Sequence, residues 1–175
     1  MNSVIALGAA LVIAASAGAT PKPAPHSDPQ WNRALTTAHA RLMQPFIVDG
    51  LQVRIDRVSA VSTFADGTPP DQGARIIEVE YWARNPQTEN IDFFDRFYAY
   101  ALMRDGSDTD GEGLSFYPLN SNVEFGDVTL TPSMVQHARF DVEVPAGGDV
   151  TSLVVFGPLD GAKVTVGLPQ LRQKM

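Results

Sequence analysis

A stretch of acidic and glycine residues from Asp105 to Gly113 offers the clearest set of metal-ligand side chains in the sequence. Its four carboxylates belong to Asp105, Asp108, Asp110 and Glu112. Carboxylate oxygens on a Gly-rich loop suit Ca²⁺, which takes roughly six to eight oxygen ligands. The spacing departs from an EF-hand loop, because aligning Gly111 with the invariant glycine leaves no glutamate at the final ligand position. The stretch therefore predicts either a Ca²⁺ or small-ligand site or a plain solvated hairpin, in which Asp and Gly supply turn geometry.

Aromatic residues suggest a second kind of site, a surface for a protein partner. The candidate residues for this surface are Trp82, Phe93 and Phe94. Aromatic side chains dominate both sandwich cores and binding patches. On a strand, Tyr98 and Tyr100 would point to one face and Phe97 to the other, so both faces of that segment carry large aromatic side chains. One face must belong to the core. We expect an N-terminal helix to cover the other, and the alternative is that this face is left open for a partner.

Weaker patterns point to catalysis and to copper. Glu78 and Glu80 share a strand face at about 6–7 Å, near the separation of paired glycosidase carboxylates. Alternating charges on an outward strand face account for them equally well. The possible copper ligands are Met134 with the three histidines, His26, His39 and His137. Positions three apart on a strand point to opposite faces, which argues against pairing Met134 with His137.

The composition excludes several classes of function. Thirteen Lys and Arg against twenty Asp and Glu give a net charge of −7, so nucleic acid and anionic membrane surfaces are unfavourable partners. The chain has no Cys, which excludes thiol catalysis and Cys-ligated metals. No G-x-S-x-G, H-E-x-x-H, G-x-x-x-x-G-K-[ST] or G-x-G-x-x-G motif is present. We therefore expect a protein that is not an enzyme and needs no cofactor.

Residues 1–19 have the features of a signal peptide. The segment contains no charged side chain, is apolar from Val4 to Ala15 and closes on Ala17-Gly18-Ala19, the small-x-small pattern of a cleavage site. It is shorter than the roughly 20 apolar residues of a membrane-spanning helix. We expect cleavage before Thr20 and a soluble protein of the periplasm or the extracellular space. Because no Cys is available for lipidation, we expect no lipid anchor and no stable membrane insertion after cleavage.

The elements that position these residues change character along the chain. Residues 20–29 form a Pro-rich spacer. Residues 30–46 are predicted to form a short helix that packs on the domain, because Trp31, Leu35, Ala38 and Leu42 recur at helical spacing before Pro45. From residue 47 to residue 170 the hydrophobic period is two. In the segment Arg75 to Asn85, for example, the apolar positions face one side and Glu78, Glu80 and Trp82 face the other.

This pattern predicts an all-β domain. Seven or eight short strands alternate with turn residues and show no helices between them, which describes two antiparallel sheets packed face to face. An immunoglobulin-like sandwich is the expected architecture, and a small barrel is the alternative.

Several short segments follow one another in a characteristic order between Leu51 and Leu168. They are IIEVEYWARN (Ile76–Asn85), Asp105-Gly106, Leu130-Thr131-Pro132, Phe140 through Pro145, and Leu153-Val154-Val155. In this succession they resemble a telokin-like bacterial domain family of unknown function. The resemblance implies an exported immunoglobulin-like sandwich, lipid-anchored or secreted and including secreted antigens, and it implies no catalytic residues. The chain departs from the family by Ser133 where Gly is common, by its longer acidic hairpin and by the helix expected before Pro45.

Together these observations predict a non-catalytic, exported binding module of the cell envelope that presents loops or an aromatic face to another protein. The alternative is an extracytoplasmic protein that binds Ca²⁺ or a small ligand through the hairpin at residues 105–112.

Overall fold

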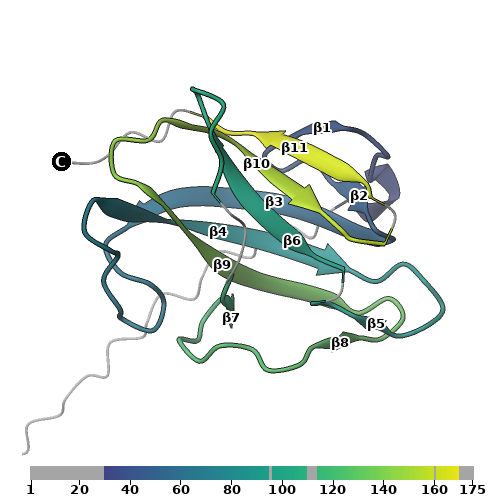
Figure 1. The fold of residues 1–175 in the computed structure, drawn as a ribbon. Helices are drawn as coiled ribbons and strands as arrows, with labels where there is room; N and C mark the ends of the chain where they lie inside the picture. The colour runs from purple at the N-terminus through teal and green to yellow at the C-terminus, as the bar shows by residue number, and fades with distance from the viewer. Residues whose placement is uncertain (1–29, 95, 110–113, 160, 170–175) are drawn as a thin grey trace, which may run out of the picture.

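The computed structural model describes residues 30–94, 96–109, 114–159 and 161–169. Within these ranges the chain forms eleven strands and one short 3₁₀ turn. The strands build a five-stranded sheet, a four-stranded sheet and a small two-stranded ladder. The two larger sheets lie against each other as a sandwich (Figure 1). The all-β prediction is thus confirmed.

The five-stranded sheet is antiparallel throughout. Its order is β2 (Phe46–Val48), β3 (Leu51–Val61), β4 (Ala74–Arg84), β9 (Val135–Pro145) and β7 (Phe116–Pro118). Strand β4 shows why it forms: Ile77, Val79, Tyr81 and Ala83 alternate along it and are all fully buried. The predicted alternation of this strand is therefore confirmed, with its polar residues on the outer face.

The four-stranded sheet contains one parallel pair. Its order is β1 (His39–Arg41), β11 (Lys163–Gly167), β10 (Val150–Phe156) and β6 (Tyr98–Met103), with β1 and β11 parallel. The two-stranded ladder pairs β5 (Ile91–Asp92) with β8 (Thr129–Leu130). Several of these strands have only two or three residues, so the strand count exceeds the seven or eight predicted.

An aromatic cluster fills the space between the sheets. The ring of Tyr81 lies 5.2 Å from that of Phe97 and 5.8 Å from that of Phe93. Phe116 and Phe140 complete the cluster from β7 and β9. Burial of such rings is the largest favourable contribution that side chains make to a core.

The predicted helix over residues 30–46 is wrong. Only Trp31–Arg33 is helical, as a single 3₁₀ turn, and the chain then runs into β1 and β2. The helical spacing of the apolar residues is overridden because β1 pairs with β11, more than a hundred residues away in the sequence. Leu35 is 48% exposed, so the proposed apolar stripe does not act as one buried face. Nowhere in the described ranges does a helix have the length and apolar character needed to cross a membrane.

The connection between β2 and β3 is a two-residue hairpin turn. Asp49 and Gly50 both have positive φ, 45° and 77°, which matches the turn type favoured by Asp-Gly between antiparallel strands. A Cβ on Gly157 would lie 2.1 Å from the Cβ of Asp49. The turn therefore depends on glycine at position 157, where the β10–β11 connection packs against it.

Candidate binding surface

Polar side chains of three neighbouring strands line up on the outer face of the five-stranded sheet. The cross-strand register forms three rows, Arg54–Trp82–His137, Arg57–Glu80–Arg139 and Ser59–Glu78–Asp141. Asp56 lies beside the first row. We call this set the polar ladder; it comprises Arg54, Asp56, Arg57, Ser59, Glu78, Glu80, Trp82, His137, Arg139 and Asp141. Their strands place these side chains together because the alternate positions face the core.

A β-bulge fixes the first row. The register of β3 against β4 shifts between Ile55 and Arg57, which leaves Asp56 as the extra residue. Its carboxylate accepts two hydrogen bonds from Arg54, from Nε at 2.5 Å and from Nη2 at 2.7 Å. It also accepts one from Trp82 Nε1 at 3.0 Å. The indole ring then stacks on the His137 imidazole at 4.1 Å and 10°. These contacts hold Trp82 in one orientation.

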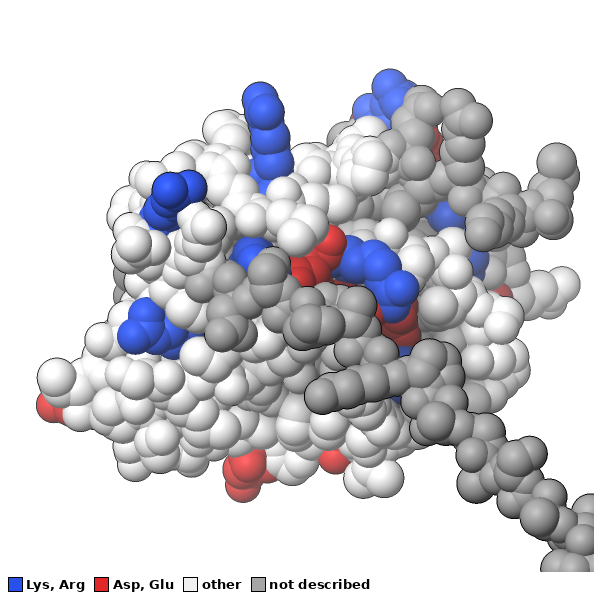
Figure 2. Space-filling view, turned by 180° about the vertical axis from the view of Figure 1, so that it is seen from behind, with Lys and Arg blue, Asp and Glu red and all other residues white. Residues whose placement is uncertain are grey.

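Alternating charges connect the second and third rows. Arg57 forms an ion pair with Glu80, and Arg139 donates to Glu78 at 2.6 Å. The side chains of Glu78 and Glu80 are 12% and 8% exposed, whereas that of Arg57 is 60% exposed. Figure 2 shows the molecule from behind, and basic and acidic side chains adjoin near the middle of that view. Both glutamates are thus engaged by arginine, which suits a structural network better than the acid–base pair of a glycosidase.

Asp141 connects the loop between β3 and β4 to the polar ladder through a hydrogen bond. Its carboxylate accepts a hydrogen bond from the Ala65 backbone N–H at 2.8 Å, and the residue is 3% exposed. Burial raises the pKa of the Asp141 carboxyl, and the nearby Glu78 and Asp66 raise it further. The Ala65 hydrogen bond and Arg139 act in the opposite direction. The ionised form of this carboxylate is therefore disfavoured in the folded protein.

The three aromatic residues predicted for a partner surface separate in the structure. Trp82 lies on the outer face, as its strand parity predicts. Phe93 is fully buried among the core rings, so its assignment to a partner surface is wrong. Phe94 is half-buried and makes edge contacts with Phe93 and Phe116. The reason is that the chain turns after β5 and inserts these rings between the sheets.

The outer face of the four-stranded sheet carries aromatic rings. The ring of Phe156 lies 5.5 Å from that of Tyr98 and 5.7 Å from that of Tyr100. The Lys163 ammonium sits 5.6 Å from the Phe156 ring centre and 5.9 Å from that of Tyr100. We call these four residues the aromatic face. The helix expected to cover Tyr98 and Tyr100 does not form, and Tyr98 is 38% exposed.

The predicted Ca²⁺ ligands lie partly in the described chain. Asp110 and Glu112 fall outside the described residues. Asp105 accepts hydrogen bonds from the Ser107 N–H and hydroxyl, which lower the pKa of its carboxyl. Asp108 forms an isolated bridge with Leu102. Among the described residues, no three His, Cys, Asp or Glu side chains are grouped to hold a metal ion. Of the possible copper ligands, His26 lies outside the described residues and His137 stacks on Trp82.

Six residues of the ladder were not predicted as site residues, namely Arg54, Asp56, Arg57, Ser59, Arg139 and Asp141. The sequence contains one signal for them. Apolar residues alternate at Leu51, Val53 and Ile55, but the next buried position is Val58, a shift of one residue. Such a shift in period indicates a bulge, which is where Asp56 lies.

A scan against known protein families gives no match, and a search of the curated proteins gives none. Solved structures do match. An uncharacterized beta-sandwich protein from Clostridium difficile aligns with a TM-score of 0.58 at 15% identity, covering 77% of this chain and 95% of that one. A "putative lipoprotein" from Bacillus subtilis aligns with a TM-score of 0.48 at 16% identity, covering 74% of this chain and 39% of that one. The first likeness supports the β-sandwich fold.

Proposed function

We propose that this protein is an exported, non-catalytic, immunoglobulin-like binding module of the cell envelope, and that it contacts a protein partner through the polar ladder. The observation that carries the proposal is the fixed orientation of Trp82, bonded to Asp56 and stacked on His137. Tryptophan, tyrosine and arginine are the residues most enriched among energetically dominant interface positions, and the polar ladder holds Trp82 together with three arginines. A side chain already held in place loses little conformational freedom on binding.

The strand order supports the immunoglobulin-like part of the proposal. In one sheet β3, β4, β9 and β7 are neighbours, and in the other β6, β10 and β11 are neighbours. This order corresponds to strands A, B, E and D packed against C, F and G of a constant-type domain. The pairing of β1 with β11 adds a short parallel strand at the edge. The telokin-like resemblance agrees with this arrangement.

The leader supports export. Residues 1–19 end on Ala17-Gly18-Ala19, and the chain has no Cys to accept a lipid. Sequencing the N-terminus of the protein from a periplasmic or culture fraction tests this part of the proposal. Thr20 as the first residue is the expected result, and an intact Met1 in the membrane fraction would contradict it.

A photo-crosslinking residue placed at Arg57 tests the partner surface, because that exposed side chain lies in the row next to Trp82. The same residue at Tyr98, on the aromatic face, is the control. We expect defined protein adducts from position 57 in whole cells and none from position 98. Trp82→Ala should weaken binding of the captured partner by about 30-fold, the effect of a dominant interface residue. Trp82→Phe keeps an aromatic ring at this position and serves as the variant that distinguishes a loss of binding from a loss of folding.

Equal adducts from both positions would contradict the proposed surface. So would a partner whose affinity is unchanged by Trp82→Ala in a protein that melts at the wild-type temperature.

A further inference from the structure

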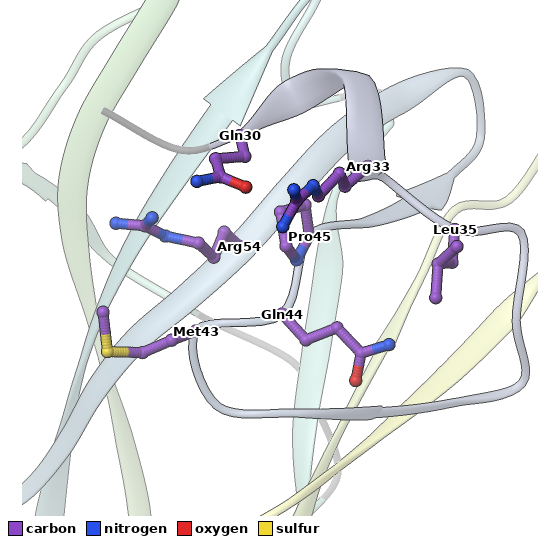
Figure 3. A pocket seen from close by; sticks show the side chains of 7 residues that line it. All are labelled: Gln30, Arg33, Leu35, Met43, Gln44, Pro45 and Arg54. Carbon is purple, nitrogen blue, oxygen red and sulfur yellow. The ribbon is translucent and has the colours of Figure 1, made fainter. Parts of the chain in front are cut away.

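A pocket opens beside the first row of the polar ladder, at the point where the chain enters the sandwich. Its volume is about 650 Å³, within the range of sites for small organic ligands. Figure 3 shows that the side chains around it come from three places, the 3₁₀ turn region, the β1–β2 connection and β3. The lining residues are Gln30, Arg33, Leu35, Met43, Gln44, Pro45 and Arg54.

Hydrogen bonds between backbone groups fix the walls of this pocket. The Leu35 N–H donates to the Pro45 carbonyl at 3.2 Å, and the Ile47 N–H donates to the Leu35 carbonyl at 3.0 Å. The Met43 N–H donates to the Ile55 carbonyl at 2.7 Å. Met43 has φ 64°, a left-handed conformation that is uncommon for a residue with a side chain. The pocket is therefore preformed, and a strained residue places an apolar side chain at its rim.

The lining combines exposed apolar groups with positive charge. Leu35 is 48% exposed and Met43 is 56% exposed, although both are large hydrophobic residues. The described lining residues include two arginines, two glutamines and no Asp or Glu. Asp56 balances the charge of Arg54. Arg33 is exposed, and no ion pair with a residue in the described ranges balances its charge.

We infer that this pocket binds a small amphipathic anion, with an oxyanion head group at Arg33 and an apolar body against Leu35 and Met43. A guanidinium forms charge-assisted hydrogen bonds with carboxylate and phosphate oxygens. The two glutamine side chains offer further N–H donors. The protein carries a net charge of −7, so a cationic cavity stands out from the molecule as a whole. This inference is independent of the proposed partner surface.

Binding of three probes to the whole mature protein tests it. Hexanoate and hexyl phosphate share a six-carbon chain with an anionic head, and hexyl glucoside has the same chain with a neutral head. We expect the two anions to raise the melting temperature saturably, by mass action on the folded state, and to shift the NMR methyl signals of Leu35 and Met43. The neutral probe should have no such effect. The affinities of the two anions identify which head group the pocket prefers.

Two variants locate the site. Arg33→Gln should weaken anion binding by about tenfold, because one charge-assisted hydrogen bond is lost. Met43→Gly removes the apolar rim and suits the positive φ at this position, so the fold is preserved. Lys163→Gln, on the opposite sheet, removes the same charge as Arg33→Gln and should leave binding unchanged. Equal binding of the neutral probe, no saturable effect of either anion, or wild-type affinity in Arg33→Gln would overturn the inference.

Discussion

The outer face of the five-stranded sheet is covered by charges that bond to one another, whereas the outer face of the four-stranded sheet is covered by aromatic rings. In the polar ladder each carboxylate has a specific donor, as Asp56 has Arg54 and Trp82. On the aromatic face Tyr98, Tyr100 and Lys163 surround Phe156 through contacts without such strict geometry. Hydrogen-bonded charges require defined positions, while ring contacts tolerate a range of them.

The two faces therefore have different roles: the polar ladder fixes the orientation of a side chain, whereas the aromatic face covers its sheet. A buried ion pair adds little net stability compared with apolar residues, but losing one partner leaves a charge that neither water nor protein satisfies. The ladder therefore fixes the position of Trp82, but breaking one of its ion pairs should cost much of the free energy of unfolding. The aromatic face shields its sheet from water. When one of its rings is removed, the loss in free energy of unfolding should scale with the buried apolar area that is removed.

The largest expected effect comes from Asp56→Ala. This change removes the carboxylate from Arg54, whose side chain is 6% exposed, and from the Trp82 indole. We expect the free energy of unfolding to fall by about 3 kcal/mol, as for other broken buried pairs. Urea denaturation measures it. Asp149→Ala breaks the exposed pair with Arg104 and is the matched control, with an expected loss below about 0.5 kcal/mol. Similar losses in the two variants would remove the distinction between the faces.

Phe156→Ala probes the aromatic face and should have the second-largest effect. The residue is half-buried and contacts both Tyr98 and Tyr100. We expect a loss of about 2 kcal/mol, less than for a fully buried phenylalanine. Phe156→Leu keeps most of the apolar volume and should recover at least half of that loss. A Phe156→Leu protein as unstable as Phe156→Ala would show that this face, too, depends on defined geometry.

Asp141→Asn tests the ladder through pH and should stabilise the protein by up to about 1 kcal/mol at neutral pH. Because the pKa of Asp141 is raised from 3.8, the folded state holds its proton more tightly than the unfolded chain does. The carboxyl's contribution is therefore most favourable below pH 3.8 and is lost as the pH rises through the raised pKa. The asparagine side chain still accepts the Ala65 hydrogen bond and carries no charge.

The measurement is the difference in unfolding free energy between Asp141→Asn and wild type from pH 3.5 to pH 7. The advantage of the variant should grow across this interval and then level off. Glu143→Gln removes a carboxylate from the same strand and accounts for general charge effects. An advantage for Asp141→Asn that shrinks as the pH rises would mean that Asp141 stabilises the fold in its ionised form.

Sequence patterns predicted the elements of both faces better than their arrangement. The period-two alternation located β4 and assigned Glu78, Glu80 and Trp82 to its outer side, because local alternation decides which face a residue takes. The same reasoning failed for residues 30–46, where pairing between His39 and Thr165 decides the structure. Long-range pairing of this kind leaves no trace in a short window of sequence.

The polar ladder was only partly predictable for the same reason. Trp82 was a candidate from its type, but its neighbour His137 depends on the register of β4 against β9, which the sequence does not specify. The position of Asp56 at a bulge could have been predicted, because the alternation of buried apolar residues shifts by one residue between Ile55 and Val58. Phe93 was assigned to the surface because aromatic side chains are frequent both in sandwich cores and in binding patches, so the residue type alone does not distinguish the two; the structure buries it fully.

The smallest expected effect, from Lys163→Gln, addresses the contrast between the faces most directly. The Lys163 ammonium lies over two rings, but its side chain is exposed, so the interaction contributes about 0.5 kcal/mol. Its removal should lower the free energy of unfolding by no more than that amount. Lys163→Arg should restore it, since a guanidinium also interacts with a ring face. A loss comparable to that of Asp56→Ala would mean that charge organises the aromatic face as it does the polar ladder.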